Sequence, residues 1–401
     1  MSSAKVYWTN PLEYQFTVKI IDCICVEDNF HISIDKEVIR PEGGGQAGDR
    51  GILQRNGVEK NIFNTIKSNG KVWLVSESSV EVGDTYNLIV DQEWRRNMMR
   101  NHTSEHLFVS ELKRLNDAVK LGYIWIDGEK GTVELSGDEI TIELLITAER
   151  KVQEIILENK PVETRFVSAK KLPANVRARE GVEEQHDILR IVSIEGIDES
   201  ACSGLHVMNT GDIGTFKILD YKIDESGTRV EFSTHAQALK QMSFVFNEVL
   251  TRKQEYPFEI QQIGAVLDKA KRNSDAKEEL IPEIVKLIES GPTISNVAGI
   301  SFRHTKLPGY SSRELRYILQ SLHHPSQSAI LLFSPGQKSN FILQINGLEK
   351  SSADLIATTV EELGGKGGGS KETYTGGFND VSDPDSLYES LVQSVVRNLQ
   401  A

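Results

Sequence analysis

The chain has 401 residues, of which 39% are apolar and 26% are charged. A chain of this length predicts roughly two to three domains. Lysine and arginine together number 45 against 58 aspartates and glutamates, giving a net charge of −13. This excludes a uniformly basic nucleic-acid-binding surface, although not a local basic patch. Most of the negative charge lies before residue 236, so a polyanionic partner is expected at the C-terminal part or at one local stripe.

The expected compartment is reducing. Three cysteines in a chain of this length cannot form a disulfide framework. Residues 1–10 show no basic run followed by an apolar stretch, and no apolar run approaches the ~18 residues needed to span a bilayer. We therefore expect a cytoplasmic protein.

The first part of the chain predicts an α+β arrangement. Residues 1–90 contain short β-branched runs separated by Gly and Asn breaks, which favours a small β-barrel. Helical periodicity follows at 91–118 and again at 148–159, with strand-like segments between and after them. Strands are expected at 187–194 and 215–223, on either side of a loop.

The second part changes character. Residues 236–290 are helical and charged, with a break near Pro257, and predict a helical connector. Residues 291–401 alternate between strand and helix patterns and predict a small α/β domain. The expected domains are therefore 1–90, 91–235, 236–290 and 291–401.

Four residues have the spacing of metal ligands. His102 and His106 are four apart on a predicted helix, so both imidazoles can face one ion. Cys202 and His206 have the same spacing on a segment where Gly204 allows a tight turn. Together they predict a Zn²⁺ site. The alternatives are surface histidines beside a core cysteine, or a purely structural zinc, because four protein ligands close the shell.

One of the three residues between the two histidines, Glu105, has a carboxylate that could serve as a general base. Glu105 directly precedes His106, about 100° around a helix from it. It is therefore expected to point away from the ligand face, which makes it a poor general base.

A glycine-rich segment is the second candidate. Pro41-Glu-Gly-Gly-Gly-Gln46, followed by Asp49, lets the backbone approach a ligand closely through Gly43, Gly44 and Gly45. Gln46 and Asp49 can then present an amide and a carboxylate. A plain turn between strands is the alternative.

These motifs occur in the order found in the editing domain of alanyl-tRNA synthetase. The glycine segment, Asn101-His-Thr-Ser-Glu-His106, Cys202-Ser-Gly-Leu-His206 and Thr210-Gly-Asp-Ile-Gly214 carry the resemblance, which covers about the first 235 residues. With no room for an aminoacylation domain, the chain resembles the freestanding long-form AlaX alanyl-tRNA editing proteins. Gly364-Gly-Lys-Gly-Gly-Gly-Ser370 resembles the glycine-rich stretch of the DHH-associated domain, although a flexible loop would read similarly.

The resemblance implies a fold and an activity. The implied fold is a small β-barrel, a zinc-containing α+β editing domain, helices and a DHH-associated C-terminal domain that serves dimerisation and tRNA contact. The implied activity is hydrolysis of serine or glycine from mischarged tRNA(Ala). His102, His106, Cys202 and His206 would bind zinc, with His102 and Cys202 at the catalytic centre, and Gln46 and Asp49 would help hold the aminoacylated 3′ end.

Three departures from the family bear on substrate choice. Glu37 stands where the family often has a threonine that helps to recognise serine, and Ser203 and Leu205 replace the usual Gly and Thr around the ligand turn. Arg40 replaces the aromatic residue before the loop's proline, where it would meet a phosphate or face solvent.

The expected partner is the acceptor stem of an aminoacyl-tRNA, read through phosphates and A-form shape. The candidate contacts, each of which also fits an ordinary solvated surface, are Gly43, Gly44, Gly45, Arg95, Arg96, Arg100, Lys170, Lys171, Arg177 and Arg179. Two other functions stay open. One is a non-catalytic tRNA-binding or oligomerising protein with a structural zinc, and the other is a deacylase of another mischarged tRNA.

Overall fold

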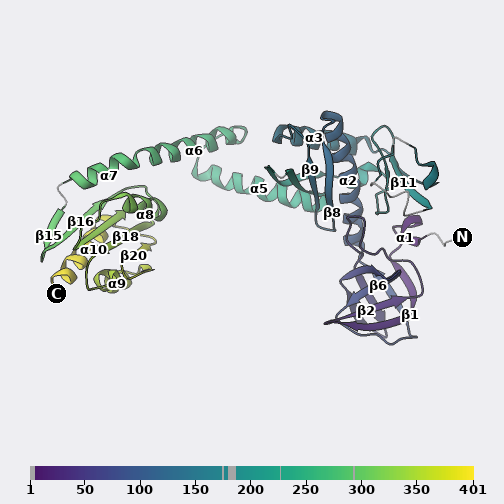
Figure 1. The fold of residues 1–401 in the computed structure, drawn as a ribbon, viewed down its shortest axis with the longest axis horizontal. Coiled ribbons are helices and arrows are strands. Elements are labelled where there is room, and N and C mark those ends of the chain that lie inside the picture. Colours follow the sequence, from purple (N-terminus) through teal and green to yellow (C-terminus); the bar gives the residue numbers. More distant parts are fainter. Residues whose placement is uncertain (1–4, 174–175, 179–186, 226, 292–293) are drawn as a thin grey trace. The chain divides into compact units, whose positions relative to one another are not determined.

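The computed structural model describes residues 5–173, 176–178, 187–225, 227–291 and 294–401. The chain forms two compact units, Met1–Glu255 and Tyr256–Ala401, and each has mixed α+β structure with its own sheets (Figure 1). None of the helices among the described residues is long and apolar enough to cross a membrane.

The first unit begins with a short helix, α1 (Val6–Thr9), and a seven-stranded antiparallel sheet ordered β4-β3-β7-β1-β2-β6-β5. Alternate residues of β1, such as Phe16, Val18 and Ile20, enter its core. The strand order begins at β4 and ends at β5, and among the described residues no pairing between these two strands closes the sheet. The predicted small β-barrel is therefore not confirmed. The strands are β1 (Gln15–Val26), β2 (Asn29–Ile34), β3 (Gly51–Arg55), β4 (Val58–Ile62), β5 (Asn64–Ser68), β6 (Lys71–Ser76) and β7 (Thr85–Val90).

The rest of this unit surrounds the long helix α2 (Gln92–Leu115). Leu107, Phe108 and Leu112 of α2 pack into the largest core, together with α3 and a four-stranded sheet ordered β13-β14-β9-β8. A three-stranded sheet, β10-β11-β12, completes this part. The elements are β8 (Lys120–Ile126), β9 (Gly131–Ser136), α3 (Ile142–Glu158), β10 (Val162–Ser168), the 3₁₀ turn η1 (Ala169–Lys171), β11 (Ile188–Ile194), β12 (Asp198–Ala201), the 3₁₀ turn η2 (Thr210–Ile213), β13 (Phe216–Asp224) and β14 (Gly227–Thr234).

The helix α5 (His235–Glu255) ends the first unit and is mostly exposed. Its large exposed apolar side chains include Phe244, Val245 and Phe246. The helical pattern from residue 236 and the break near Pro257 are confirmed, because α5 ends at Glu255.

The second unit is a three-layer arrangement of helices on both faces of a six-stranded sheet, ordered β15-β16-β17-β18-β20-β19. Leu331 and Phe333 of β17 pack with α9 and α10, whereas Ile330 and Leu332 pack with α7 and α8. The elements are η3 (Ile260–Gln262), α6 (Ile263–Glu279), α7 (Ile281–Ser290), β15 (Ile294–Val297), β16 (Ile300–Lys306), α8 (Ser312–Ser321), β17 (Ser328–Ser334), β18 (Ser339–Asn346), α9 (Ser352–Glu362), β19 (Lys366–Gly369), β20 (Thr373–Phe378) and α10 (Pro384–Gln400).

The glycine-rich stretch near residue 366 is an edge strand, not a flexible loop. Lys366–Gly369 forms β19 and pairs antiparallel with β20. A Cβ on Gly365 would lie 2.3 Å from the ring of Phe378, and one on Gly376 would lie 2.5 Å from the ring of Phe341. These glycines therefore let aromatic rings of the core lie flat against the backbone.

Candidate metal centre

The helix α2 carries two of the predicted ligands. The Asp91 side chain caps its N-terminus by accepting a hydrogen bond from the Trp94 backbone N–H at 2.9 Å. One turn apart farther along, His102 and His106 are 4% and 3% exposed. They are therefore interior residues, and the alternative of two surface histidines is wrong.

The other two predicted ligands, Cys202 and His206, lie on the turn after β12. Gly204 lies between them and packs against the His102 ring, since an added Cβ would lie 1.9 Å from His102 Cε1. The φ of Gly204 is not in the left-handed region. The glycine is thus required by close approach to a ligand ring and not by the turn conformation that its sequence position suggested.

All four ligand side chains meet in one cluster. The ligand atoms of His102, His106, Cys202 and His206 lie within 4.8 Å of one another. Cys202 Sγ is 3.4 Å from His102 Nε2 and 3.3 Å from His206 Nε2. Two such atoms bound tetrahedrally to one Zn²⁺, at ~2.3 and ~2.0 Å, would be about 3.5 Å apart. The residues present can hold a metal ion.

A second set of residues directs the three imidazoles. The Nδ1 atoms of His102 and His106 are each 2.7 Å from an acceptor, Gln46 Oε1 and Asp198 Oδ2 respectively. His206 Nδ1 is 3.2 Å from Thr103 Oγ1, whose own hydrogen is donated to the Met99 carbonyl oxygen. Because these acceptors hold a proton on Nδ1, Nε2 is the atom that each ring can offer to a metal, and His106 must first lose its Nε2 proton.

The cluster also favours the ionised thiol. Burial alone disfavours a thiolate, but the neighbouring His102 and His206 imidazoles outweigh it and hold the pKa of Cys202 well below its usual range. Burial, aided by His102, holds the pKa of His206 well below its usual range, so this ring is neutral. Burial opposes protonation of His106, yet the Asp198 carboxylate raises the pKa of His106 to about 10 in the metal-free chain. A thiolate and a neutral imidazole are the forms that bind zinc.

Glu105 is closer to the cluster than its helical position suggested. Its carboxylate is 1% exposed and lies 3.6 Å from His106 Nε2, where the sequence predicted that it would point away. It is held there by Arg177, whose Nη1 donates to Glu105 Oε1 at 3.2 Å. Arg177 Nε also lies 3.4 Å from Asp198 Oδ1. Arg177 is therefore part of a buried charge network beside the cluster.

Arg40 is a buried residue whose side chain holds the glycine-rich segment in place. It is 3% exposed, so the expected phosphate contact or solvent exposure of this residue is wrong. Its guanidinium donates to four carbonyl oxygens of its own segment, those of Pro41, Gly43, Gln46 and Ala47, at 2.7–3.3 Å. The loop between β2 and β3 thus contains a turn at Gly44 and Gly45, and the Arg40 side chain holds that turn in place.

Asp49 and Arg95 form a buried ion pair, which corrects the roles predicted for both. Each side chain is 0% exposed, and Arg95 Nε and Nη2 donate to the two carboxylate oxygens at 3.0 and 2.6 Å. The Arg40 backbone N–H also donates to Asp49 Oδ2 at 2.6 Å. The geometry leaves Asp49 no free face for the 3′ end and Arg95 no surface for tRNA. The pair fastens the glycine segment to α2.

Gln46 joins the two halves of the metal cluster. Its Oε1 accepts from His102 Nδ1 at 2.7 Å and from the Leu205 backbone N–H at 3.0 Å. The side chain is 0% exposed. Gln46 is therefore placed to orient a ligand rather than to contact substrate, which corrects the part predicted for it.

The remaining predicted tRNA contacts lie in different settings. Arg96, Lys170 and Lys171 are exposed, whereas Arg100 is half-buried and its Nε donates to the Asp212 carbonyl oxygen at 2.9 Å. Gly43, Gly44 and Gly45 have φ of 155°, 64° and 82°, values that favour glycine. Arg179 lies outside the described residues.

The three positions predicted to select the amino acid are separated by the fold. Leu205 is 1% exposed and belongs to the large core, while Glu37 is exposed and its carbonyl accepts from the Val6 backbone N–H. Ser203 is exposed beside Cys202, and a Cβ on Gly44 would lie 3.2 Å from its Oγ. Of the three, Ser203 is the exposed residue directly beside a predicted ligand.

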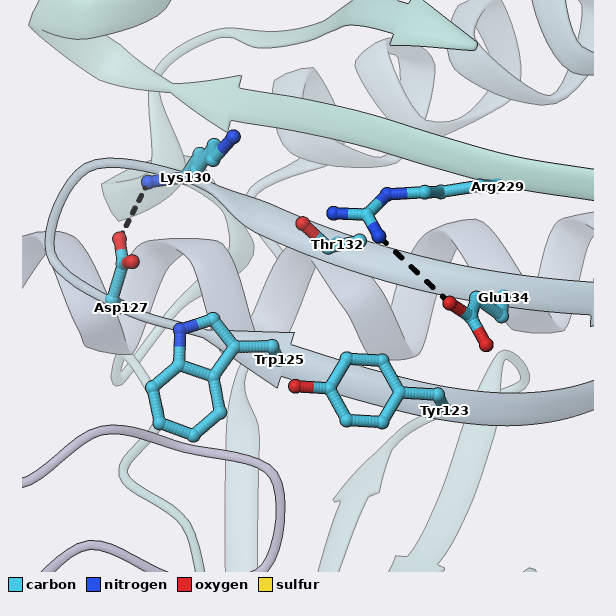
Figure 2. Close-up of a pocket in the computed structure, with 7 residues that line it drawn as sticks. All are labelled: Tyr123, Trp125, Asp127, Lys130, Thr132, Glu134 and Arg229. Atoms are coloured by element: carbon cyan, nitrogen blue, oxygen red, sulfur yellow. Dashed lines mark hydrogen bonds and ion pairs between the residues drawn. The ribbon is translucent and has the colours of Figure 1, made fainter. Parts of the chain in front are cut away.

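A shallow cavity of about 440 Å³ lies on the outer face of the β13-β14-β9-β8 sheet and contains none of the four ligands (Figure 2). Its charged side chains are mutually compensated: Arg229 faces Glu134 and Glu231, and Lys130 pairs with Glu231. It is lined by Tyr123, Trp125, Asp127, Lys130, Thr132, Glu134 and Arg229.

Comparison with known proteins agrees with this site. A family described as the threonyl and alanyl tRNA synthetase second additional domain matches residues 189–231, which include Cys202 and His206. The alanyl-tRNA editing protein AlaX-L of Pyrococcus horikoshii is 27% identical over 99% of this chain and 99% of its own length. The chain is similar to this editing protein along almost its whole length.

Other relatives include the alanine–tRNA ligases of Jannaschia sp. and Thermofilum pendens. They are 28% and 26% identical over 86% and 98% of the chain, but the matches cover 42% and 44% of the ligases. The chain therefore spans less than half the length of each ligase. A solved C-Ala domain of Aquifex aeolicus alanyl-tRNA synthetase matches 27% of the chain and 98% of its own, with 19% identity and a TM-score of 0.24, too low to indicate a shared fold.

Proposed function

We propose that this protein is a trans-editing hydrolase that removes a wrongly attached amino acid from tRNA(Ala), with His102, His106, Cys202 and His206 holding Zn²⁺. The observation that carries the proposal is the convergence of these four side chains in a chain similar to an alanyl-tRNA editing protein over 99% of its length. The substrates proposed are Ser-tRNA(Ala) and Gly-tRNA(Ala).

The chain's own residues prepare the site. Gln46, Asp198 and Thr103 orient the three imidazoles, and the low pKa of the Cys202 thiol provides a thiolate. A zinc ion bound there would supply positive charge that orients a water or the substrate's amino group. Because an aminoacyl ester is already an activated acyl group, alignment of substrate and water accounts for much of the required catalysis.

We also propose the residues that contact tRNA, the oligomeric state and the domain boundaries. The exposed Arg96, Lys170 and Lys171 are proposed to contact the phosphates of the tRNA acceptor stem. A homodimer is proposed through the C-terminal region. The proposed domains are a β domain at 1–90, a zinc-binding editing domain at 91–235, a helical connector at 236–290 and a glycine-rich, DHH-associated-like domain at 291–401.

A second function is favoured by the ligand count. Four protein ligands fill a tetrahedral zinc shell, as in structural sites, which supports a tRNA-binding protein without hydrolysis. The two functions differ in one assay. Serine release from Ser-tRNA(Ala) is measured beside Ala-tRNA(Ala), Gly-tRNA(Ala) and Ser-tRNA(Ser), using zinc-loaded protein.

Selective release of serine or glycine from tRNA(Ala) supports editing. Release from Ser-tRNA(Ser) at the same rate would indicate a deacylase that does not read the tRNA. Binding of tRNA without release from any of the four substrates would contradict the proposed hydrolysis and favour the structural-zinc function.

A further inference from the structure

Cys202 is the least buried of the four cluster residues. His102, His106 and His206 are each 5% exposed or less, whereas Cys202 is half-buried and the next residue, Ser203, is exposed. Gly44 borders the same place, since its Cβ position is 3.2 Å from Ser203 Oγ. Ser203 and Gly44 are therefore exposed residues directly beside the segment that carries Cys202 and His206.

Two aromatic side chains, those of Trp8 and Phe166, lie near Ser203. The indole N–H of Trp8, in α1, donates to the Ser203 carbonyl oxygen at 3.0 Å. Phe166, in β10, has its ring centroid 6.1 Å from that of Trp8. Half of the Phe166 side chain is exposed, although Phe166 lies on a strand of a small sheet.

The position of Phe166 is tied to the ligand turn. Phe166 lies opposite Arg190 in the β10–β11 ladder. Arg190 is 8% exposed, and its Nη1 donates to the carbonyl oxygens of Cys202 and Gly204 at 3.0 and 2.9 Å. Strand β11 therefore holds Phe166 through the β-ladder and holds the segment with Cys202 and His206 through the Arg190 side chain.

A cation already occupies part of this aromatic surface. Lys5 Nζ lies 4.5 Å from the centroid of the Trp8 ring. The Arg190 guanidinium carbon lies 5.9 Å from the same centroid, so Phe166, which is 50% exposed, offers the more open ring face, with Trp8 and the Lys5 ammonium nearby. An aromatic face next to a cation is the combination that binds a nucleobase and its adjoining phosphate.

We infer that Phe166 and Trp8 form a subsite for the nucleobase of the terminal nucleoside of the aminoacylated tRNA. The inference rests on the proposed function and adds the place where the substrate's last base lies. The ester is attached to the terminal ribose, so when the ester reaches Cys202 the base attached to that ribose lies close to the adjacent Ser203, which Trp8 contacts and near which Phe166 lies. Every base has a flat face, so stacking here would secure the end of the tRNA without reading its sequence.

Steady-state deacylation of Ser-tRNA(Ala) by Phe166→Ala tests the subsite. Loss of one stacked base is expected to raise KM about five- to a hundredfold, with kcat changed little. Phe166→Tyr keeps the flat ring and should restore KM. Phe63→Ala is the matched control, because Phe63 is also an exposed phenylalanine near a strand end and is 41% exposed. An unchanged KM in folded Phe166→Ala would overturn the inference.

A pair of small substrates makes the test specific for the base. The wild-type chain should hydrolyse the seryl ester of adenosine with a lower KM than the seryl ester of ribose without a base. Phe166→Ala should lose most of this difference. If the difference persists in Phe166→Ala, the base binds elsewhere. If Phe166→Ala impairs both esters equally, the ring acts on the amino acid or on the turn, and the subsite is wrong.

Failure of the proposed function can be distinguished from failure of the base subsite. If the wild-type chain releases no amino acid from any substrate, the proposed function fails. The subsite is then judged from the affinity for uncharged tRNA(Ala) and for the same tRNA lacking its terminal adenosine. A preference for the complete tRNA that Phe166→Ala abolishes would support the subsite, and equal binding of both tRNAs would contradict it.

Discussion

Two buried polar clusters share the helix α2 and differ in what they leave unsatisfied. In the first, Arg95 and Asp49 pair through two hydrogen bonds and a third comes from the Arg40 backbone. In the second, His102 and His106 face Cys202 and His206 with Nε2 and Sγ atoms directed at one another. The first cluster is complete as it stands, whereas the second gathers lone pairs that a cation would satisfy. Burial of polar groups alone therefore does not identify a functional site.

The largest expected effect comes from removing a ligand of the second cluster. Cys202→Ala should reduce deacylation of Ser-tRNA(Ala) more than about a hundredfold, because even the outer partners of metal ligands are worth about 10- to 100-fold. Bound zinc, measured by mass spectrometry, should fall in parallel. Cys25→Ala, at an exposed cysteine, is the control and should change neither quantity. Full activity in a zinc-free Cys202→Ala chain would refute the role given to this cluster.

Breaking the first cluster should cost stability rather than chemistry. Arg95→Met leaves the Asp49 charge buried without its partner, so unfolding free energy should fall by about 3–5 kcal/mol. Urea denaturation followed by tryptophan fluorescence measures this, since Trp8, Trp73, Trp94 and Trp125, the four tryptophans of the chain, all lie in the first unit.

The double variant Asp49→Leu, Arg95→Met sharpens the distinction. Removing both charges should be less destabilising than removing one, because no unpaired charge remains. The folded fraction of the single variant should still bind zinc. A single variant as stable as wild type would mean that the pair is not the structural element described here.

A smaller effect is expected from the residues that orient the ligands. Asp198→Asn should lower zinc affinity about 10- to 100-fold, because the amide oxygen accepts from His106 Nδ1 more weakly than the carboxylate does. Competition with a coloured chelator measures the affinity. Asp220→Asn, at an exposed aspartate of β13, should leave the affinity unchanged. Equal affinities in the two variants would show that Asp198 does not support the metal.

The smallest effect is expected at the surface. Lys170→Ala and Lys171→Ala should each raise KM for Ser-tRNA(Ala) a few-fold at unchanged kcat. Each lost phosphate contact should also lower the slope of log affinity against log salt by about 1. Lys120→Ala, at another exposed lysine, serves as control. A salt slope unchanged in both variants would place the tRNA elsewhere.

The sequence predicted the cluster of three histidines and one cysteine better than its surroundings. Helical spacing was enough to place His102 beside His106, and the ligand turn could be found because Cys-x3-His residues carry recognisable chemistry. The Nδ1 partners could not all be found, since Asp198 lies 92 positions from His106 and an isolated aspartate has no local pattern. Thr103 was visible between the two histidines, but its bond to His206 depends on the fold.

The same limit explains the errors. Gln46, Asp49 and Arg40 have polar side chains on a glycine-rich segment, which predicted contact with substrate, but spacing does not reveal whether such groups face inward. Their partners on α2 and within the loop bury them. In the second unit, the alternation of strands and helices over 291–401 followed from the residue pattern, whereas β19 escaped prediction because glycines in an edge strand resemble a loop.

The most direct test is the rate of serine release from Ser-tRNA(Ala) as zinc is added back to metal-free chain. The rate of serine release should rise in proportion to bound zinc and level off at one zinc per chain. The same titration of Cys202→Ala should give no rise. A rate that is independent of bound zinc, or that stays at zero when one zinc is bound, would contradict the claim that this cluster is the hydrolytic centre.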